Sequence, residues 1–359
     1  MTGNRIITDK GLVLLLTASL ALNVSSCSTI IKNTLSSTEG GRAFTSFVAK
    51  TYDPSLVKET TVKLPYDFYE NVSKHIASGE RVEIIAANPG WGCPIERYGD
   101  FDKPNTFLGK MNKAFDGLAA VVDYNPQSSL EVSAKEISEG LNNISNQFPE
   151  GTIQWNILGF SHAGNILNEM IRQDYVPNLK KAFFIASPLN GVEFIFPTWY
   201  VKENYAFIFG VDKAISDPSF TQLLKGNEFY KTSKIILPKK DITCYLVGIE
   251  HDSGNPFVNG SPFILDKDDK VVKLTSQLTD ITKYNGANFG GAIIYKGRSL
   301  NHTNVIDDDW LLNHLFNFIK EEHTIQSFPS NLNEIPVIQV PFSGKINDSL
   351  LPDMNKFGK

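Results

Sequence analysis

Short apolar segments alternate with amphipathic ones along most of the chain, and this rhythm limits the possible folds more than any other feature. Helical spacing predicts helices at 129–148, 163–172 and 307–322. Runs of aliphatic and β-branched residues predict six strands, at 81–87, 118–124, 153–158, 181–186, 243–249 and 291–295. Strands this continuously apolar are buried on both faces. The sequence therefore predicts an α/β fold, a mostly parallel sheet flanked by helices.

The first of these helices has a core face that can be assigned residue by residue. Apolar side chains recur there at intervals close to the helical repeat. The candidate core positions are Val132, Ile137, Leu141 and Ile144.

Two segments depart from the strand and helix rhythm. Residues 194–224 are rich in aromatic side chains and predict an inserted cap or lid at about 194–235, which either forms an acyl pocket or is a plain hydrophobic cover. Residues 324–359 form a C-terminal extension interrupted by prolines. This extension either adds an edge strand to the sheet or wraps around the body.

The first residues of the chain predict a secretory signal. Arg5 and Lys10 precede an apolar stretch at 11–24, shorter than the ~20 residues that cross a bilayer. Small residues follow, and then Cys27. The segment resembles the lipobox of bacterial lipoproteins, which implies cleavage after residue 26, lipidation of Cys27 and a bacterial cell-envelope location. The Ser28 that follows favours the outer membrane over the inner one. An ordinary signal peptide with an incidental cysteine is the alternative.

Composition excludes several classes of partner. The net charge of −5 provides no basic surface for nucleic acid. We expect no metal and no cofactor, because no cysteine or histidine spacing is typical of a metal site. Residues 28–45 are rich in Ser, Thr, Gly and Asn and predict a flexible tether, which we assign to 27–59. Cys93 and Cys244 either pair outside the cytoplasm or remain as buried thiols.

The motif with the most chemistry is a serine between a predicted strand and a predicted helix. Gly159, Phe160, Ser161, His162, Ala163 and Gly164 occupy this position in order. A nucleophilic serine on such a turn needs small residues two positions before and after it, and Gly159 and Ala163 meet that requirement. The helix that follows directs the positive end of its dipole toward the same point. Ser161 is therefore the candidate nucleophile.

From about residue 81 to residue 319 the chain resembles the lipase and esterase members of the α/β-hydrolase superfamily. The nucleophile motif has Ala163 where the family usually has glycine, and the segment 187–192 resembles the small-Pro-x-x-Gly stretch that often follows the next strand in lipases. The resemblance implies an α/β-hydrolase domain at 60–323.

A serine hydroxyl needs a base, and the chain has six histidines. His302 lies between the last predicted core strand and the last predicted helix, where the order of serine, acid and histidine places the base. It also begins a stretch similar to the His-Thr-x-Val pattern of lipases. His251 follows a strand but precedes the closing strand, which disfavours it.

The third member of a triad orients the histidine, and several aspartates are candidates. Asp269 begins a stretch at 269–276 that resembles the Asp-Gly-Val-Val-Pro-x-x-Ser pattern of lipases, with Lys270 in place of glycine. Asp252, Asp266 and Asp268 remain alternatives. Asp307–Asp309 come after His302, and we expect them to favour the N-terminus of the last helix.

An acyl transfer also needs N–H groups that face the developing oxyanion. The backbone N–H of His162 is one candidate. The other is that of Trp91, in a glycine-rich loop at 88–92 that resembles the His-Gly-x-x-Gly stretch of lipases. A plain Pro-Gly turn is the alternative for this loop.

Together these features predict a lipid-anchored serine hydrolase that cleaves carboxylic esters with a lipase-like or lysophospholipase-like substrate. An acyltransferase, thioesterase or amidase on the same triad, and a non-catalytic surface lipoprotein, remain alternatives. The stretch at 251–256 resembles part of the chymotrypsin-like serine signature. It lacks two of its glycines, and the strand and helix alternation contradicts a double β-barrel.

Overall fold

The computed structural model describes residues 59–90, 95–125, 128–192, 218–225, 239–252, 272–298, 300, 302, 304–321 and 324–341. The predicted signal at 1–26, Cys27, Cys93 and most of the predicted cap lie outside these residues. Within them, no helix is long and apolar enough to cross a membrane.

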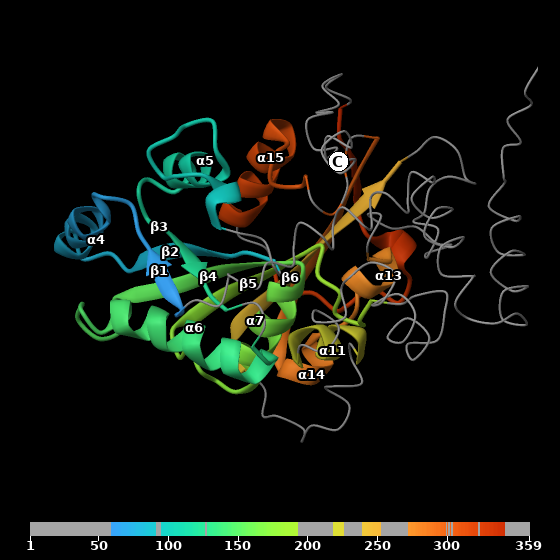
Figure 1. Ribbon diagram of the computed structural model, residues 1–359, viewed down its shortest axis with the longest axis horizontal. Coiled ribbons are helices and arrows are strands. Elements are labelled where there is room, and N and C mark those ends of the chain that lie inside the picture. The colour runs from blue at the N-terminus through green and yellow to red at the C-terminus, as the bar shows by residue number, and fades with distance from the viewer. Residues whose placement is uncertain are drawn as a thin grey trace, which may run out of the picture.

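In the described part of the chain, eight strands form one sheet, flanked by helices (Figure 1). The strands are β1 (Thr61–Lys63), β2 (Val82–Asn88), β3 (Ala119–Asp123), β4 (Ile153–Phe160), β5 (Leu179–Ile185), β6 (Lys239–His251), β7 (Ala287–Gly297) and β8 (Val337–Gln339). The helices are α4 (Phe68–Ala77), α5 (Phe107–Ala114), α6 (Leu130–Ser145), α7 (His162–Arg172), α11 (Pro218–Lys225), α13 (Leu274–Gln277), α14 (Thr282–Asn285) and α15 (Asp309–Lys320), with short 3₁₀ turns at Ile95–Tyr98 and Leu332–Glu334.

The strand order is β1-β3-β2-β4-β5-β6-β7-β8. Among these described strands only β1 runs antiparallel to its neighbour, and the other pairs are parallel, so the predicted fold class is confirmed. The chain goes from β2 outward to β3 and then returns past β2 to β4. This reversal between β2 and β4 is a topological switch point, where α/β sheets bind ligands at the carboxyl ends of the strands.

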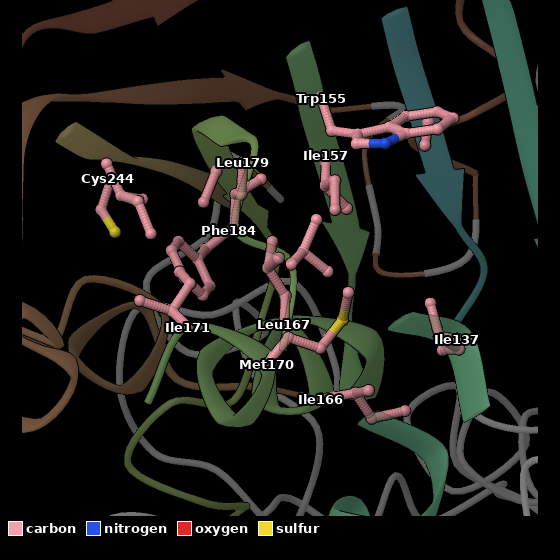
Figure 2. Close-up of a cluster of buried hydrophobic side chains, with 14 of the residues drawn as sticks. Ile137, Trp155, Ile157, Ile166, Leu167, Met170, Ile171, Leu179, Phe184 and Cys244 are labelled. Carbon is pink, nitrogen blue, oxygen red and sulfur yellow. The ribbon is translucent and has the colours of Figure 1, made fainter. Parts of the chain in front are cut away.

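Helices cover both faces of the sheet, as the apolar strands predict. The buried side chains of α6 and α7 join one core cluster, and those of α5 and α15 join the other (Figure 1). Figure 2 shows the first cluster, where α7 directs Leu167 and Met170 toward Ile157 and Phe184 of the central strands. The helix α7, which directly follows the candidate nucleophile Ser161, is therefore held in place by a packed core.

One predicted core residue is wrong. Val132 of α6 is 47% exposed, whereas Ile137, Leu141 and Ile144 are buried as predicted. At 100° per residue, Val132 lies about 140° around the helix from Ile137, which places it on the solvent side. Leu130 and Ala134 complete the buried stripe instead.

Three features outside the central strands can be compared with the predictions: the start of the last helix, the C-terminal extension and the predicted cap. Asp308 is the N-cap of α15, and its carboxylate accepts a hydrogen bond from the Leu311 N–H at 2.9 Å. In the C-terminal extension, β8 pairs parallel to β7, so the edge-strand alternative holds for this part. Within the predicted cap, the described helix α11 docks on α6, because the side chain of Gln222 binds the Leu130 N–H at 2.7 Å.

Candidate active site

Ser161 occupies the turn between β4 and α7, at the carboxyl edge of the sheet. Its φ of 53° and ψ of −127° are unusual for a residue with a side chain, and such strain persists only where neighbouring structure enforces it. Two backbone hydrogen bonds do so here. The Ser161 N–H donates to the Ile185 carbonyl, and the Ser161 carbonyl accepts from the Gly164 N–H, each at 2.9 Å. The turn has the geometry of a nucleophile elbow.

The glycines of the motif let β4 and α7 approach each other. A Cβ on Gly159 would lie 2.8 Å from the Gly164 Cα and 2.9 Å from the Ala163 carbonyl oxygen. A Cβ on Gly164 would lie 2.0 Å from the Ser187 Oγ. That hydroxyl is buried and donates to the Gly159 carbonyl at 3.1 Å. Gly159 is therefore required by the close approach of the β4 and α7 backbones, and Gly164 by the Ser187 side chain. A serine elbow on a mostly parallel sheet covered on both faces confirms the predicted α/β-hydrolase fold.

His302 meets Ser161 from a segment far along the sequence. Its Nε2 lies 2.6 Å from the Ser161 Oγ, although 141 residues separate the two. His302 is buried and lies between β7 and α15. When the hydroxyl donates, Nε2 accepts, and the ring proton is then on Nδ1. The pair has the distance and chemistry of a nucleophile and its general base.

The loop after β2 lies against the same serine. A Cβ on Gly90 would lie 3.0 Å from the Ser161 Cβ and 3.7 Å from its Oγ. The Tyr124 hydroxyl, at the end of β3, donates to the Pro89 carbonyl at 2.9 Å and is buried. This contact orients the peptide that leads into Gly90. Trp91 itself lies outside the described residues, and His162 is the first residue of α7.

The His162 side chain is buried, and neither ring nitrogen has a hydrogen-bond partner among the described residues. Burial disfavours the charged ring and lowers its pKa from the ordinary 6.5 to about 4. The side chain is thus a neutral packing element, separate from any role of the His162 backbone N–H.

This burial makes the protein sensitive to acid. The unfolded chain protonates His162 below about pH 6.5, whereas the folded chain resists until about pH 4. We therefore expect the free energy of unfolding to fall as pH falls through that interval, with His162 accounting for about 2 kcal/mol between pH 7 and pH 5. Urea denaturation of wild type and His162→Met at both pH values measures this contribution. Equal losses in the two proteins would contradict it.

The candidate acids are only partly within the described residues. Asp266, Asp268 and Asp269 lie outside them. Asp252 directly follows β6, is half-buried, and donates its backbone N–H to the Gly297 carbonyl at 3.1 Å.

Gln277 ties the segment that follows Asp269 to the end of β6. This buried side chain accepts from the Ile249 N–H at 2.7 Å and donates to the Val272 carbonyl at 2.9 Å. Val272 is therefore held near the carboxyl end of β6.

Sequence patterns missed the contacts of Tyr124, His251 and Gln277. Each binds a backbone group of a segment near the site, and the His251 Nδ1 lies 2.8 Å from the Leu300 carbonyl oxygen. Side-chain bonds to distant backbone leave no periodicity in a sequence. A polar residue at the carboxyl end of an apolar strand is the one signal that could have indicated Tyr124 and His251.

Cys244 is a free, buried thiol of the core. The Asn285 amide lies 3.8 Å from its Sγ, and burial raises the pKa of the thiol to about 12. The thiol is therefore protonated at neutral pH and unreactive. For Cys244, the structure supports the buried-thiol alternative.

No protein-family model matches this sequence, and no curated protein does. Several solved structures resemble it weakly. The lin2722 gene product of Listeria innocua is 15% identical over 73% of this chain and 99% of its own, with a TM-score of 0.44. Lipase BlEst2 of Bacillus licheniformis in its propeptide form is 11% identical over 69% of this chain and 52% of its own, with a TM-score of 0.46. Phospholipase PlaB of Legionella pneumophila is 12% identical over 67% and 60%, with a TM-score of 0.44.

Proposed function

We propose that this chain is a serine hydrolase that cleaves carboxylic esters through an acyl-enzyme. The observation that carries the proposal is the 2.6 Å contact between the Ser161 Oγ, on a strained turn, and the His302 Nε2. A strained serine in contact with a buried histidine is the arrangement that acyl transfer requires. The fold supports the same reading, since the pair lies at the switch point of the sheet.

The mechanism follows from these two side chains. The Ser161 Oγ attacks the acyl carbon while His302 Nε2 takes the hydroxyl proton. The carbonyl oxygen becomes an oxyanion, for which we propose the N–H groups of His162 and Trp91 as donors, helped by the positive end of α7. His302 then gives the proton to the departing alkoxide. Water attacks the acyl-enzyme with His302 again as base, which releases the acid and restores Ser161.

The imidazolium formed in each step needs a carboxylate near Nδ1, and we propose Asp269 for this role. Its stretch at 269–276 resembles the lipase pattern, with Lys270 in place of glycine, and Gln277 binds Val272, three residues later, and Ile249 near the carboxyl end of β6. Asp252 is the alternative at the same strand end.

The location belongs to the proposal as well. We propose that the signal at 1–26 is removed and that lipid on Cys27 anchors the protein to a bacterial envelope membrane, the outer membrane in preference to the inner. The basic, apolar and small-residue order before Cys27 supports this. The substrate would then be a lipid or small-molecule ester within reach of a membrane surface.

Hydrolysis of p-nitrophenyl esters from acetate to palmitate by the full chain in detergent tests the proposal. We expect turnover with a dependence on acyl length, and membrane association that is lost in Cys27→Ala. Transfer to an added alcohol in preference to water would indicate an acyltransferase. Selective turnover of thioesters or amides would indicate those chemistries. No turnover, with no labelling by a fluorophosphonate, would contradict the enzyme proposal and favour a non-catalytic lipoprotein.

A further inference from the structure

A second histidine, His251, binds the backbone of the segment that carries His302. His251 is the last residue of β6, is buried, and has its Nδ1 2.8 Å from the Leu300 carbonyl oxygen. A carbonyl oxygen can only accept a hydrogen bond, so Nδ1 carries the proton and donates it. The geometry thereby assigns the orientation of this ring.

Leu300 lies two residues before His302 and is itself buried. Two residues span at most about 7 Å of chain, so fixing the Leu300 carbonyl restricts where the His302 ring can lie. We propose that His251 is a positioning residue, which holds this segment so that His302 Nε2 meets the Ser161 Oγ. The inference rests on the proposed acyl-transfer function and adds a residue to it.

Several backbone hydrogen bonds and an ion pair surround this contact. His251 pairs with Gly297 in the ladder between β6 and β7. The Gly297 carbonyl accepts from the Asp252 N–H at 3.1 Å and from the Leu300 N–H at 3.3 Å. One residue earlier in both strands, Glu250 pairs with Lys296 at 2.8 Å. The chain thus turns directly after β7, and the hydrogen bond from His251 to the Leu300 carbonyl holds the end of this turn against β6.

Loss of the donor would leave a buried carbonyl without its partner, and the segment would shift to satisfy it. A displacement near 1 Å of a catalytic group can reduce the rate by about 10²-fold. In this role His251 acts on His302 through the Leu300 segment and not on the substrate. We therefore expect kcat to fall by about 10- to 100-fold in His251→Leu, with KM changed by less than about threefold.

Three variants separate positioning from stability. His251→Asn keeps a donor close to the place of Nδ1, whereas His251→Gln keeps polarity but moves the donor further out, and His251→Leu has none. Asn178→Ala is the matched control, since the Asn178 amide also donates to a backbone carbonyl, that of Ile153 at 2.9 Å, at the opposite edge of the sheet. The readouts are kcat, KM, melting temperature and the second-order rate of Ser161 labelling by a fluorophosphonate.

We expect the kcat and the labelling rate of His251→Asn to stay within about threefold of wild type. In His251→Gln and His251→Leu both rates should fall together. Asn178→Ala should lower the melting temperature and leave kcat unchanged. Wild-type rates in His251→Leu, or equal losses in the Asn and Gln variants, would overturn the inference. Wild type that labels without hydrolysing esters would overturn the ester proposal alone, because the labelling comparison still tests His251. Wild type that does not label would overturn both.

Discussion

We expect Ser161→Ala to reduce kcat for ester hydrolysis by about 10⁴-fold or more, to the level that binding and oxyanion donors alone provide. The alanine keeps the Cβ, so the contact with Gly90 and the backbone of the elbow remain. Only the hydroxyl that lies 2.6 Å from the His302 Nε2 is removed. Steady-state turnover of a p-nitrophenyl ester, with burst amplitude in the wild type, measures the effect.

The same contact makes a sharper prediction for the pair. His302→Ala should cost nearly as much as Ser161→Ala, and the double variant should be no slower than the slower single one. The two side chains act as a unit, so removing the second after the first removes nothing more.

Ser138→Ala is the matched control for this series. Ser138 is also buried, and its hydroxyl binds the Ala134 carbonyl within α6 at 2.6 Å, away from the elbow. Its kcat should equal that of wild type. Losses that add in the double variant, or a Ser161→Ala protein that retains a tenth of the activity, would remove Ser161 and His302 from one mechanism.

The strands could be predicted because burial on both faces leaves a mark in the sequence. β2 to β7 fall on the six predicted runs, with ends that differ by a few residues, and the sheet extends further along β6 and β7 than their apolar cores indicate. Val132 shows where the pattern is insufficient. Its spacing of five residues from Ile137 already places it about 140° around the helix, so apolar character alone does not indicate burial.

The candidate site was only partly predictable for a different reason. The serine turn has a local pattern, because a side chain on Gly159 would meet the backbone of α7 and one on Gly164 would meet Ser187. The meeting of Ser161 with His302 depends instead on the order of strands in the sheet, which no local pattern contains. The bonds from Tyr124 and His251 to backbone carbonyls depend on the fold in the same way.

We expect Asp269→Asn to reduce kcat by about 10³- to 10⁴-fold while Asp252→Asn stays within about tenfold of wild type. A carboxylate at Nδ1 keeps the ring proton there, which leaves Nε2 free to accept from Ser161. It also stabilises the imidazolium that forms when the serine attacks. An amide in its place offers its own N–H to the ring, favours the other tautomer, and provides no charge.

Measurements of kcat and of fluorophosphonate labelling on the same two variants decide between the carboxylates, because labelling also requires His302 to take the Ser161 proton. The conservative change from carboxylate to amide keeps shape and polarity, so a loss in one variant reports charge and tautomer more than packing. A loss in Asp252→Asn with normal rates in Asp269→Asn would assign the acid to the residue that directly follows β6. It would also mean that Gln277, by binding Val272, serves the fold of this segment and leaves the reaction unaffected.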